Sequence, residues 1–222
     1  MVDDVDQDVT GPEKDGADPN GSTAGPVRPE GYPDDLERDV ARAGGVPYHV
    51  RPIRPDDAAR LVAFHEHLSA HSVYMRFFSF HPTLSKAEVK RFTTVDYVDR
   101  LALVAELDDR LIAVGRFDRD DGSDEAEVAF IVADEHQQQG IGTLLLDELA
   151  RAARQRNVRT FRAETLAENQ NMLDVFRHAG FPVTSSVEYG TVTVRFPVAA
   201  TDAYRAALAD REAQRVPAPG GA

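Results

Sequence analysis

The 222-residue sequence contains no cysteine and no tryptophan, and its only lysines are Lys14, Lys86 and Lys90. The absence of cysteine excludes disulfide bonds, thiolate zinc sites and a cysteine nucleophile. No run approaches the roughly 18 apolar residues of a membrane span. The N-terminal stretch MVDDVDQD also lacks the pattern of a secretory signal. We therefore expect a cytoplasmic protein with no membrane partner.

Positive charge is scarce as well. The chain has 38 acidic residues against 25 lysines and arginines, and its formal net charge is -13. Binding to nucleic acid needs lysine and arginine concentrated on one face, so we expect no nucleic-acid partner. The surplus of carboxylates suggests the hypothesis of adaptation to high salt, in which hydrated carboxylates keep a protein soluble.

The length and the 42% hydrophobic content fit one ordinary domain with tails. Residues 1–46 are rich in Asp, Gly and Pro with almost no apolar periodicity, so we expect a disordered acidic tail. A short helix over residues 34–43 would be marginal by itself. Residues 47–198 form the predicted domain, and residues 199–222 are predicted to form a C-terminal helix and tail.

Patterns of period 2 and period 3.6 alternate along the predicted domain, which indicates a mixed α/β sheet flanked by helices. The predicted strands are YHVRPI (48–53), RLALVAEL (100–107), RLIAVGRF (110–117), EAEVAFIVAD (125–134), VRTFRAET (158–165) and the hairpin SVEYGTVTVRFPV (186–198). The predicted helices cover residues 56–68 with Asp56 as cap, 73–80, 85–94 with Ser85 as cap, 141–156, 169–180 and 201–214. A tight antiparallel hairpin is expected across Asp108 and Asp109.

A glycine-containing turn at residues 137–142 joins the strand 125–134 to an amphipathic helix. The apolar face of that helix consists of Ile141, Leu144, Leu145, Leu149, Ala152 and Ala153. The first N–H groups of a helix are unpaired and its dipole favours negative charge, so phosphate is the natural ligand of this turn. A Walker A loop is excluded because Thr143, not lysine, follows Gly142, and a Rossmann turn would need a third glycine in place of Leu145.

The pattern Gln137-x-x-Gly140-x-Gly142 resembles the Q/R-x-x-G-x-G/A pyrophosphate turn of the GNAT superfamily of N-acetyltransferases. A second stretch, ENQNMLDVFRHAGF (168–181), is similar to the family's E-N-x-x-A-x-x-L-Y-x-K-x-G-F region, with Asn169 at the asparagine. The resemblance covers residues 48–197. It implies a mainly antiparallel sheet flanked by helices, with acetyl-CoA as co-substrate and no metal.

The same resemblance implies a binding site for acetyl-CoA. The backbone amides of residues 138–143 would bind the pyrophosphate, and the strand 130–133 would pair with the pantetheine arm. The implied site residues are Ile131, Val132, Ala133, Gln137, Gln138, Gln139, Gly140, Ile141, Gly142, Thr143 and Asn169. A Cβ at position 140 or 142 would displace the phosphates. The simpler alternatives are glycines that serve only the turn, and Asn169 as a helix N-cap.

Acetyl transfer to an amine also needs a base, because a lysine with an ordinary pKa near 10.4 is neutral in only about one part in a thousand at pH 7.4. Glu127 lies close to where protein lysine acetyltransferases of this superfamily keep a general-base glutamate. On a central strand beside a cleft we expect this carboxylate to be partly desolvated. Glu125, on the same face, is the alternative base, and a solvent-facing Glu127 with no catalytic role is the other alternative. The backbone N–H near Val132 would polarise the thioester carbonyl.

Many small-molecule members of the superfamily have a tyrosine near the position of Phe176, which protonates the leaving thiolate. This departure leaves open whether the thiolate leaves unprotonated, with help from water, or with a proton from Tyr189 or Tyr97.

His65 and His67 lie two residues apart on a predicted helix, so they point in different directions and do not share a metal ion.

The residues before the first hairpin bear on the acceptor. SVYMRFFSFHPTLSKAEVKRFTTVDYVDRLALVAE (72–106) resembles the S-x-Y-x-R-F-F, L-S and F-T-x-x-D-Y runs of Pat-type protein lysine acetyltransferases, which silence AMP-forming acyl-CoA synthetases. The resemblance implies a protein lysine as acceptor. The alternatives are a small-molecule N-acetyltransferase acting on a polyamine, amino acid or drug, and a non-catalytic acetyl-CoA sensor, which the presence of Glu127 disfavours. Core packing is an alternative explanation for the aromatic residues of SVYMRFF but is a weaker one for Arg76.

Overall fold

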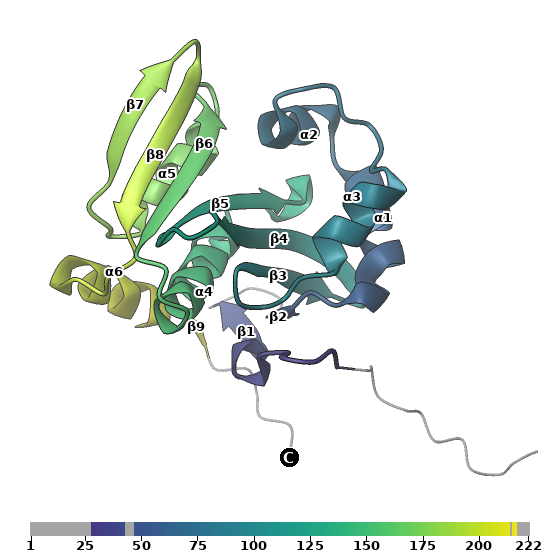
Figure 1. The fold of residues 1–222 in the computed structure, drawn as a ribbon, viewed down its shortest axis with the longest axis horizontal. Helices are drawn as coiled ribbons and strands as arrows, with labels where there is room; N and C mark the ends of the chain where they lie inside the picture. The colour runs from purple at the N-terminus through teal and green to yellow at the C-terminus, as the bar shows by residue number, and fades with distance from the viewer. Residues whose placement is uncertain (1–27, 43–46, 214, 217–222) are drawn as a thin grey trace, which may run out of the picture.

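The computed structural model describes residues 28–42, 47–213 and 215–216 (Figure 1). Its strands are β1 (Arg38–Arg42), β2 (Tyr48–Pro52), β3 (Arg100–Leu107), β4 (Arg110–Arg119), β5 (Glu125–Val132), β6 (Thr160–Leu166), β7 (Thr184–Glu188), β8 (Thr191–Pro197) and β9 (Arg215–Val216). Its α-helices are α1 (Ala58–His67), α2 (Ala70–Phe77), α3 (Lys86–Thr93), α4 (Ile141–Gln155), α5 (Gln170–His178) and α6 (Asp202–Ala213). Three short 3-10 helices are η1 (Asp34–Leu36), η2 (Pro55–Asp57) and η3 (Asp134–His136).

Within the described ranges the nine strands form one sheet in the order β7-β8-β6-β5-β4-β3-β2-β1-β9. β5 and β6 are parallel, and the other neighbouring pairs are antiparallel. The predicted mixed, mainly antiparallel fold is therefore confirmed. The hairpin prediction is also confirmed, because Asp108 and Asp109 join β3 to β4 with φ angles of 48° and 61°, as a two-residue turn of this kind requires.

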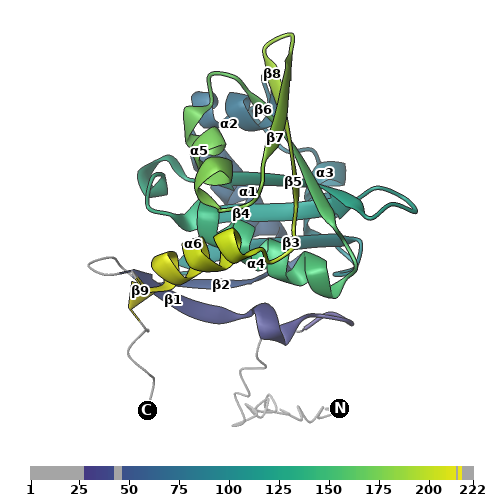
Figure 2. The same ribbon diagram turned by 90° about the vertical axis from the view of Figure 1, so that its left-hand side faces the viewer.

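Helices cover both faces of the sheet (Figures 1 and 2). One face packs against α4, α5 and α6, and the predicted apolar face of α4 is buried there, with Leu145 and Leu149 fully inaccessible to solvent. The other face packs against α1, α2 and α3. The helix α6 is part of the body, because Tyr204 is buried and its ring stacks on Phe181 with centroids 4.3 Å apart. None of the helices in these ranges is long and apolar enough to cross a bilayer.

The N-terminal segment differs from the expected structureless tail. Residues 28–42 contain η1 and β1, and β1 pairs antiparallel with β2 at the edge of the sheet. Leu36 and Val40 are buried in the core, and Tyr32 packs edge-on against Tyr97 with ring centroids 5.7 Å apart. Three well-spaced apolar residues thus anchor an acidic segment, and β1 covers an edge that β2 would otherwise expose. The rest of the expected tail, residues 1–27 and 43–46, lies outside the described residues.

The predicted cap of α1 is also wrong. Asp56 is exposed, and the residue that organises the start of the helix is Asp57, the last residue of η2. The Asp57 carboxylate accepts a hydrogen bond of 2.8 Å from the backbone N–H of Arg54. By contrast, Ser85 caps α3 as predicted, and it forms a capping box with Glu88.

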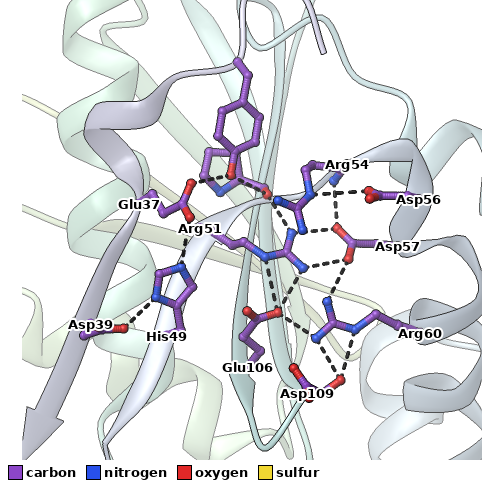
Figure 3. A network of polar contacts seen from close by, with 12 residues as sticks. Glu37, Asp39, His49, Arg51, Arg54, Asp56, Asp57, Arg60, Glu106 and Asp109 are labelled. Carbon is purple, nitrogen blue, oxygen red and sulfur yellow. Dashed lines mark hydrogen bonds and ion pairs between the residues drawn. The ribbon is translucent and has the colours of Figure 1, made fainter. Parts of the chain in front are cut away.

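Asp57 belongs to a buried ion-pair network that joins α1 to the sheet (Figure 3). The Arg51 guanidinium donates two hydrogen bonds to Asp57, of 2.7 and 2.8 Å, and another of 2.9 Å to Glu106. Arg51 and Asp57 are almost fully buried, with 2% and 1% of their side chains exposed. Burial by itself raises the pKa of Asp57, but the hydrogen bonds from Arg51 and Arg54 outweigh burial and hold this pKa below its ordinary value. The network therefore stabilises the folded chain as a charged unit.

We expect Arg51→Met to lower the free energy of unfolding by about 3 kcal/mol, because it leaves the buried Asp57 carboxylate with only a longer side-chain contact to Arg60, at 3.3 Å. Urea denaturation at neutral pH measures this loss. The matched control is Arg177→Met, which breaks the exposed pair of Arg177 and Asp174 and should change stability by less than about 1 kcal/mol. Equal losses in the two variants would contradict the role assigned to the buried pair.

Candidate active site

A cleft of about 590 Å³ opens where β5 separates from β6. The two strands pair only over residues 125–127 of β5, and beyond that point they diverge (Figure 1). The walls of the cleft come from β5, β6, α2, α5 and the start of α4. It is lined by nine of the eleven predicted acetyl-CoA residues, and also by the predicted base: Glu127, Ile131, Val132, Gln137, Gln138, Gly140, Ile141, Gly142, Thr143 and Asn169.

The other two predicted residues, Ala133 and Gln139, do not line the cleft. The Ala133 N–H donates to the carbonyl of Ile112 on β4 at 2.8 Å, and its side chain packs in the core beneath α1, α2 and α3. The side-chain amide of Gln139 donates to the backbone carbonyl of Glu135 at 2.9 Å. These residues therefore shape the turn and offer no side-chain contact to a molecule in the cleft.

The turn before α4 presents backbone N–H groups to the cleft. Gly140 has a φ angle of 80°, in the left-handed region that favours glycine, and Gln138 in the same turn also has a positive φ of 59°. The first backbone N–H of the helix with an intrahelical partner is that of Leu144, which donates to Gly140 at 3.0 Å. The preceding N–H groups of α4 are therefore available to an anion. A Cβ on Gly142 would meet Val175 at an ordinary contact distance of 3.4 Å, so protein packing does not demand a glycine there.

The open edge of β5 also presents backbone groups. The Ala133 N–H donates to Ile112 of β4 at 2.8 Å, and the Glu125 carbonyl accepts from the N–H of Asp120, the residue after β4, at 3.2 Å. Because the N–H and C=O groups of successive residues in a strand point to opposite sides, those of Phe130 and Val132 point away from β4, toward the cleft. The Val132 carbonyl accepts a hydrogen bond of 3.1 Å from Gln137. This edge has the arrangement that an extended amide-containing arm needs for pairing.

A polar network that the sequence did not reveal fixes the turn to α2. Asp134 accepts hydrogen bonds from the backbone N–H and the hydroxyl of Ser69, at 2.9 and 2.6 Å, and from the Ser72 hydroxyl at 2.7 Å. The Gln137 side chain in turn donates to the Ser72 oxygen at 3.0 Å. Burial acts to raise the pKa of Asp134, but these hydrogen bonds outweigh it and lower the pKa below its ordinary value. The side chain of Gln137 is thus a brace between α2 and β5.

The two candidate bases differ in position. Glu127 lines the cleft, whereas Glu125 does not. Glu127 forms an ion pair with Arg162 of β6 at 3.5 Å, and Glu125 pairs with Arg162 and Arg195 at 3.5 and 3.3 Å. The Glu127 side chain is 49% exposed, so about half of it is shielded and the carboxylate remains open to solvent. The parting of β5 and β6 beyond Glu127 explains this exposure.

Neither tyrosine considered as a proton donor lies at the cleft. Tyr97 is buried and its hydroxyl donates to the carbonyl of Ile53 at 2.8 Å, while burial raises its pKa to about 12. Tyr189 is almost fully exposed in the turn between β7 and β8. Phe176 does line the cleft, and its ring packs against Phe130 and Phe196. Both tyrosine alternatives are therefore set aside.

Asn169 has the capping role that was considered for it. Its side-chain oxygen accepts a hydrogen bond of 3.1 Å from the backbone N–H of Met172, so Asn169 caps α5 and lines the cleft at once.

His65 is buried and bonds through its ring to the carbonyl of His81 at 2.8 Å, and His67 bonds to the carbonyl of Ala63 at 2.6 Å. Among the described side chains, no group of three or more potential metal ligands is placed to bind an ion.

Several further cleft residues had no predicted role in binding acetyl-CoA. They are His71, Ser72, Met75, Arg76 and Phe78 from α2 and its end, and Glu164, Asp174 and His178 from β6 and α5. The only sequence signal for this group was the SVYMRFF motif around Arg76. That motif did not predict that α2 forms a wall of the cleft.

The comparisons with known proteins agree with this geometry. The model of the acetyltransferase (GNAT) family matches residues 65–181. The chain is 32% identical over 137 residues to acetyltransferase Pat of Mycolicibacterium smegmatis, which covers 60% of this chain and 40% of that protein. The crystal structure of the GNAT domain of S. lividans PAT is 44% identical with a TM-score of 0.71, and the match covers 75% of this chain and 99% of that domain. The structure of yncA from Salmonella typhimurium with its cofactor acetyl-CoA shares the fold at 17% identity and a TM-score of 0.57, with coverage of 70% and 96%.

The chain therefore belongs to the GNAT family of acetyltransferases, whose members use acetyl-CoA. It spans 40% of the length of the Mycolicibacterium relative.

The network around Asp134 leads to a prediction about stability. Asp134→Ala removes three hydrogen bonds between α2 and the turn, so we expect a loss of about 1 kcal/mol at neutral pH. Because the folded pKa of Asp134 is lowered, its stabilisation is complete above the ordinary value of 3.8 and is lost as the pH falls through the folded pKa. Urea denaturation from pH 7 to pH 2.5 should show the two proteins converging.

The matched control is Glu135→Ala, which removes a neighbouring exposed carboxylate whose ion-pair contact is a distant one with His136, at 4.0 Å. It should leave both the stability and its pH dependence unchanged. A constant difference between wild type and Asp134→Ala down to the lowest pH would contradict the charge-dependent role of Asp134.

Proposed function

We propose that the chain transfers the acetyl group of acetyl-CoA to the side-chain amine of a protein lysine in a ternary complex, with Glu127 as the general base. The observation that carries this proposal is the juxtaposition, in one cleft, of the glycine-containing turn at a helix N-terminus, an open strand edge and a carboxylate. The 44% identity to the GNAT domain of S. lividans PAT supports a protein acceptor, as does the resemblance of residues 72–106 to Pat-type enzymes.

The residues of the cleft fit acetyl-CoA. The backbone N–H groups of Ile141, Gly142 and Thr143 would bind the pyrophosphate at the positive end of the helix dipole. The edge of β5 at Phe130 and Val132 would pair with the amides of the pantetheine arm. Gly142 supports this assignment. A side chain at this position would fit beside Val175, so protein packing does not explain the glycine, whereas space for the pyrophosphate would.

Acetyl-CoA supplies an acetyl group that is activated as a thioester, and the protein supplies proton transfer and electrostatics. Glu127 would accept the proton of the acceptor ammonium, directly or through one water, so that a neutral nitrogen attacks. Its half-exposed position lets that proton pass to solvent. The Val132 N–H, directed toward the cleft, would stabilise the negative charge that develops on the thioester oxygen.

The nitrogen would add to the thioester carbonyl, and the C–S bond would break when the carbonyl forms again. The nitrogen loses its second proton as it becomes an amide, and this proton balances the one gained by the thiolate, directly or through solvent. Because an ordinary thiol has a pKa of about 8.5, the thiolate can leave without a strong acid. Phe176 offers no proton, which agrees with this route.

An assay with acetyl-CoA, a purified AMP-forming acyl-CoA synthetase and a panel of small amines separates the candidate functions. We expect CoA release and acetylated lysine with the synthetase and little turnover with polyamines, amino acids or drugs. Efficient turnover with a small amine would replace the proposal by a small-molecule N-acetyltransferase, and tight acetyl-CoA binding without any turnover would indicate a sensor.

The turn assignment predicts the effect of Gly142→Asp. The substitution adds a negative charge where the pyrophosphate would bind, so acetyl-CoA affinity should fall at least tenfold, about 1.4 kcal/mol. Folding should survive, because the Cβ is tolerated and an acidic residue in the first turn of a helix is favourable. Calorimetric titration measures the affinity, and Gly142→Asn, of the same shape without the charge, is the control. Unchanged affinity in a folded Gly142→Asp variant would refute the turn assignment.

The assignment of the base predicts the effect of Glu127→Gln. The variant keeps the shape of the side chain but removes the proton acceptor, so kcat should fall about 10²- to 10⁴-fold while acetyl-CoA still binds with near-native affinity. The rate of the variant should keep rising with pH, since free amine and hydroxide replace the base.

Glu125→Gln is the matched control for this prediction, because Glu125 shares the strand, the face and the Arg162 partner but lies outside the cleft lining. It should retain most of the activity. Loss of activity in Glu125→Gln with retention in Glu127→Gln would exchange the two roles, and wild-type profiles in both variants would place the base elsewhere.

A further inference from the structure

Arg76 lies in the last turn of α2 and lines the cleft together with Glu127. It also borders a small apolar pocket of about 40 Å³ beneath α1, α2 and α3. Across the described part of the chain, no hydrogen bond or ion pair involves its guanidinium group, which lies 5.2 Å from the centre of the Phe77 ring. A cation at the wall of an active-site cleft is therefore left without a counter-ion.

The carboxylates that could neutralise Arg76 are already engaged. Asp118 accepts hydrogen bonds from Arg100 at 2.9 Å and from Arg116 at 3.1 Å. Glu127 forms its ion pair with Arg162 on the opposite side of the cleft. In the described lining of the cleft Arg76 is therefore the one arginine or lysine, and Asp118, the nearby carboxylate that is not the proposed base, is already held by Arg100 and Arg116.

The pKa shifts of Arg76 and Arg116 agree with the lack of a direct counter-ion for Arg76. Burial lowers the pKa of Arg76, and Glu127 and Asp118 oppose the shift only in part. Burial likewise lowers the pKa of the neighbouring Arg116, to about 10. Two guanidinium groups are therefore held close together in a partly desolvated place, where a carboxylate from outside would form short, charge-assisted hydrogen bonds.

The location of Arg76 indicates which substrate would supply that carboxylate. Ser72, at the other end of α2, is tied to the predicted pyrophosphate turn through Asp134 and Gln137. Arg76 follows Ser72 by one helical turn, a rise of about 6 Å. It therefore lies away from the phosphates, on the wall that it shares with the proposed base, where the acceptor amine must arrive.

We propose that Arg76 binds a carboxylate of the acceptor, so that the enzyme favours lysines with an aspartate or glutamate beside them. This inference rests on the proposed lysine acetyltransferase function and names the acceptor class. The planar guanidinium matches a carboxylate in a bidentate manner, which a lysine at this position would not do. The second possible source of the carboxylate is the acyl group of a dicarboxylic acyl-CoA, because Arg76 also borders the apolar pocket.

Bisubstrate analogues test the proposal without requiring turnover. In each analogue the Nε atom of a peptide lysine is joined to the sulfur of CoA through an acetyl bridge. One peptide carries aspartate on both sides of the lysine, and the other carries asparagine there. Calorimetry with wild-type protein should show at least tenfold tighter binding of the aspartate analogue.

Variants then assign the preference to Arg76. Arg76→Gln should bring the two affinities within about twofold of each other, and Arg76→Lys should retain an intermediate preference because it keeps the charge but not the bidentate geometry. Arg205→Gln is the matched control, since Arg205 is an exposed arginine of α6 outside the cleft lining, and it should behave as wild type. Acetyl-CoA affinity should be the same in all of these proteins, which confirms that they are folded.

Each other outcome overturns the inference in a different way. Equal affinity of wild type for the two analogues, or a preference that persists in Arg76→Gln, removes Arg76 as the recognition residue while leaving the lysine acceptor intact. If neither analogue binds more tightly than CoA itself, the lysine acceptor and hence the proposed function fail. If wild type binds succinyl-CoA more tightly than acetyl-CoA and Arg76→Gln does not, the carboxylate belongs to the acyl donor.

Discussion

The separation of β5 from β6 after Glu127 is the constraint on which the rest of the site depends. β6 stays paired with β8 along its whole length, so the backbone groups of Phe130 and Val132 are left facing the cleft. Gly115 permits this position of β5, because a Cβ there would lie 2.9 Å from the Phe130 ring. Backbone N–H and C=O groups that lose their hydrogen bonds to water cost free energy unless another partner replaces the water. In the proposed function, the amides of the pantetheine arm would be that partner.

The network around Asp134 joins the two halves of the cleft into one unit. The turn before α4 belongs to the predicted donor side, and α2 carries Arg76 on the predicted acceptor side. Asp134 and Gln137 connect them through Ser69, Ser72 and the Val132 carbonyl, over distances of 2.6 to 3.1 Å. A movement of α2 would therefore also disturb the turn, and in the proposed function these short hydrogen bonds would set the distance between the donor and acceptor positions.

Local patterns sufficed for the elements whose signals are local. The β3–β4 hairpin followed from two residues that tolerate positive φ, and the buried face of α4 followed from its 3.6-residue period. The strand β1 could not be found in this way, because its stability comes from pairing with β2 and from a few apolar anchors in an acidic segment. The role of Gln137 as a brace and the exposure of Glu127 depend on where α2 and β6 lie, which is tertiary information that no single-sequence pattern contains.

The use of arginine for the cations around the cleft has a chemical consequence. Arg76 lines the cleft and Arg162 pairs with the proposed base, whereas the two described lysines, Lys86 and Lys90, lie on α3 outside the cleft lining. An arginine keeps its proton at any pH that the enzyme meets, whereas a lysine close to a base loses it readily and becomes a nucleophile. Under the proposed function, a cleft with Arg76 rather than a lysine on its wall would therefore hold positive charge without offering an amine of its own to the thioester. Arg76 would then attract the carboxylate of an acceptor without competing with the acceptor amine.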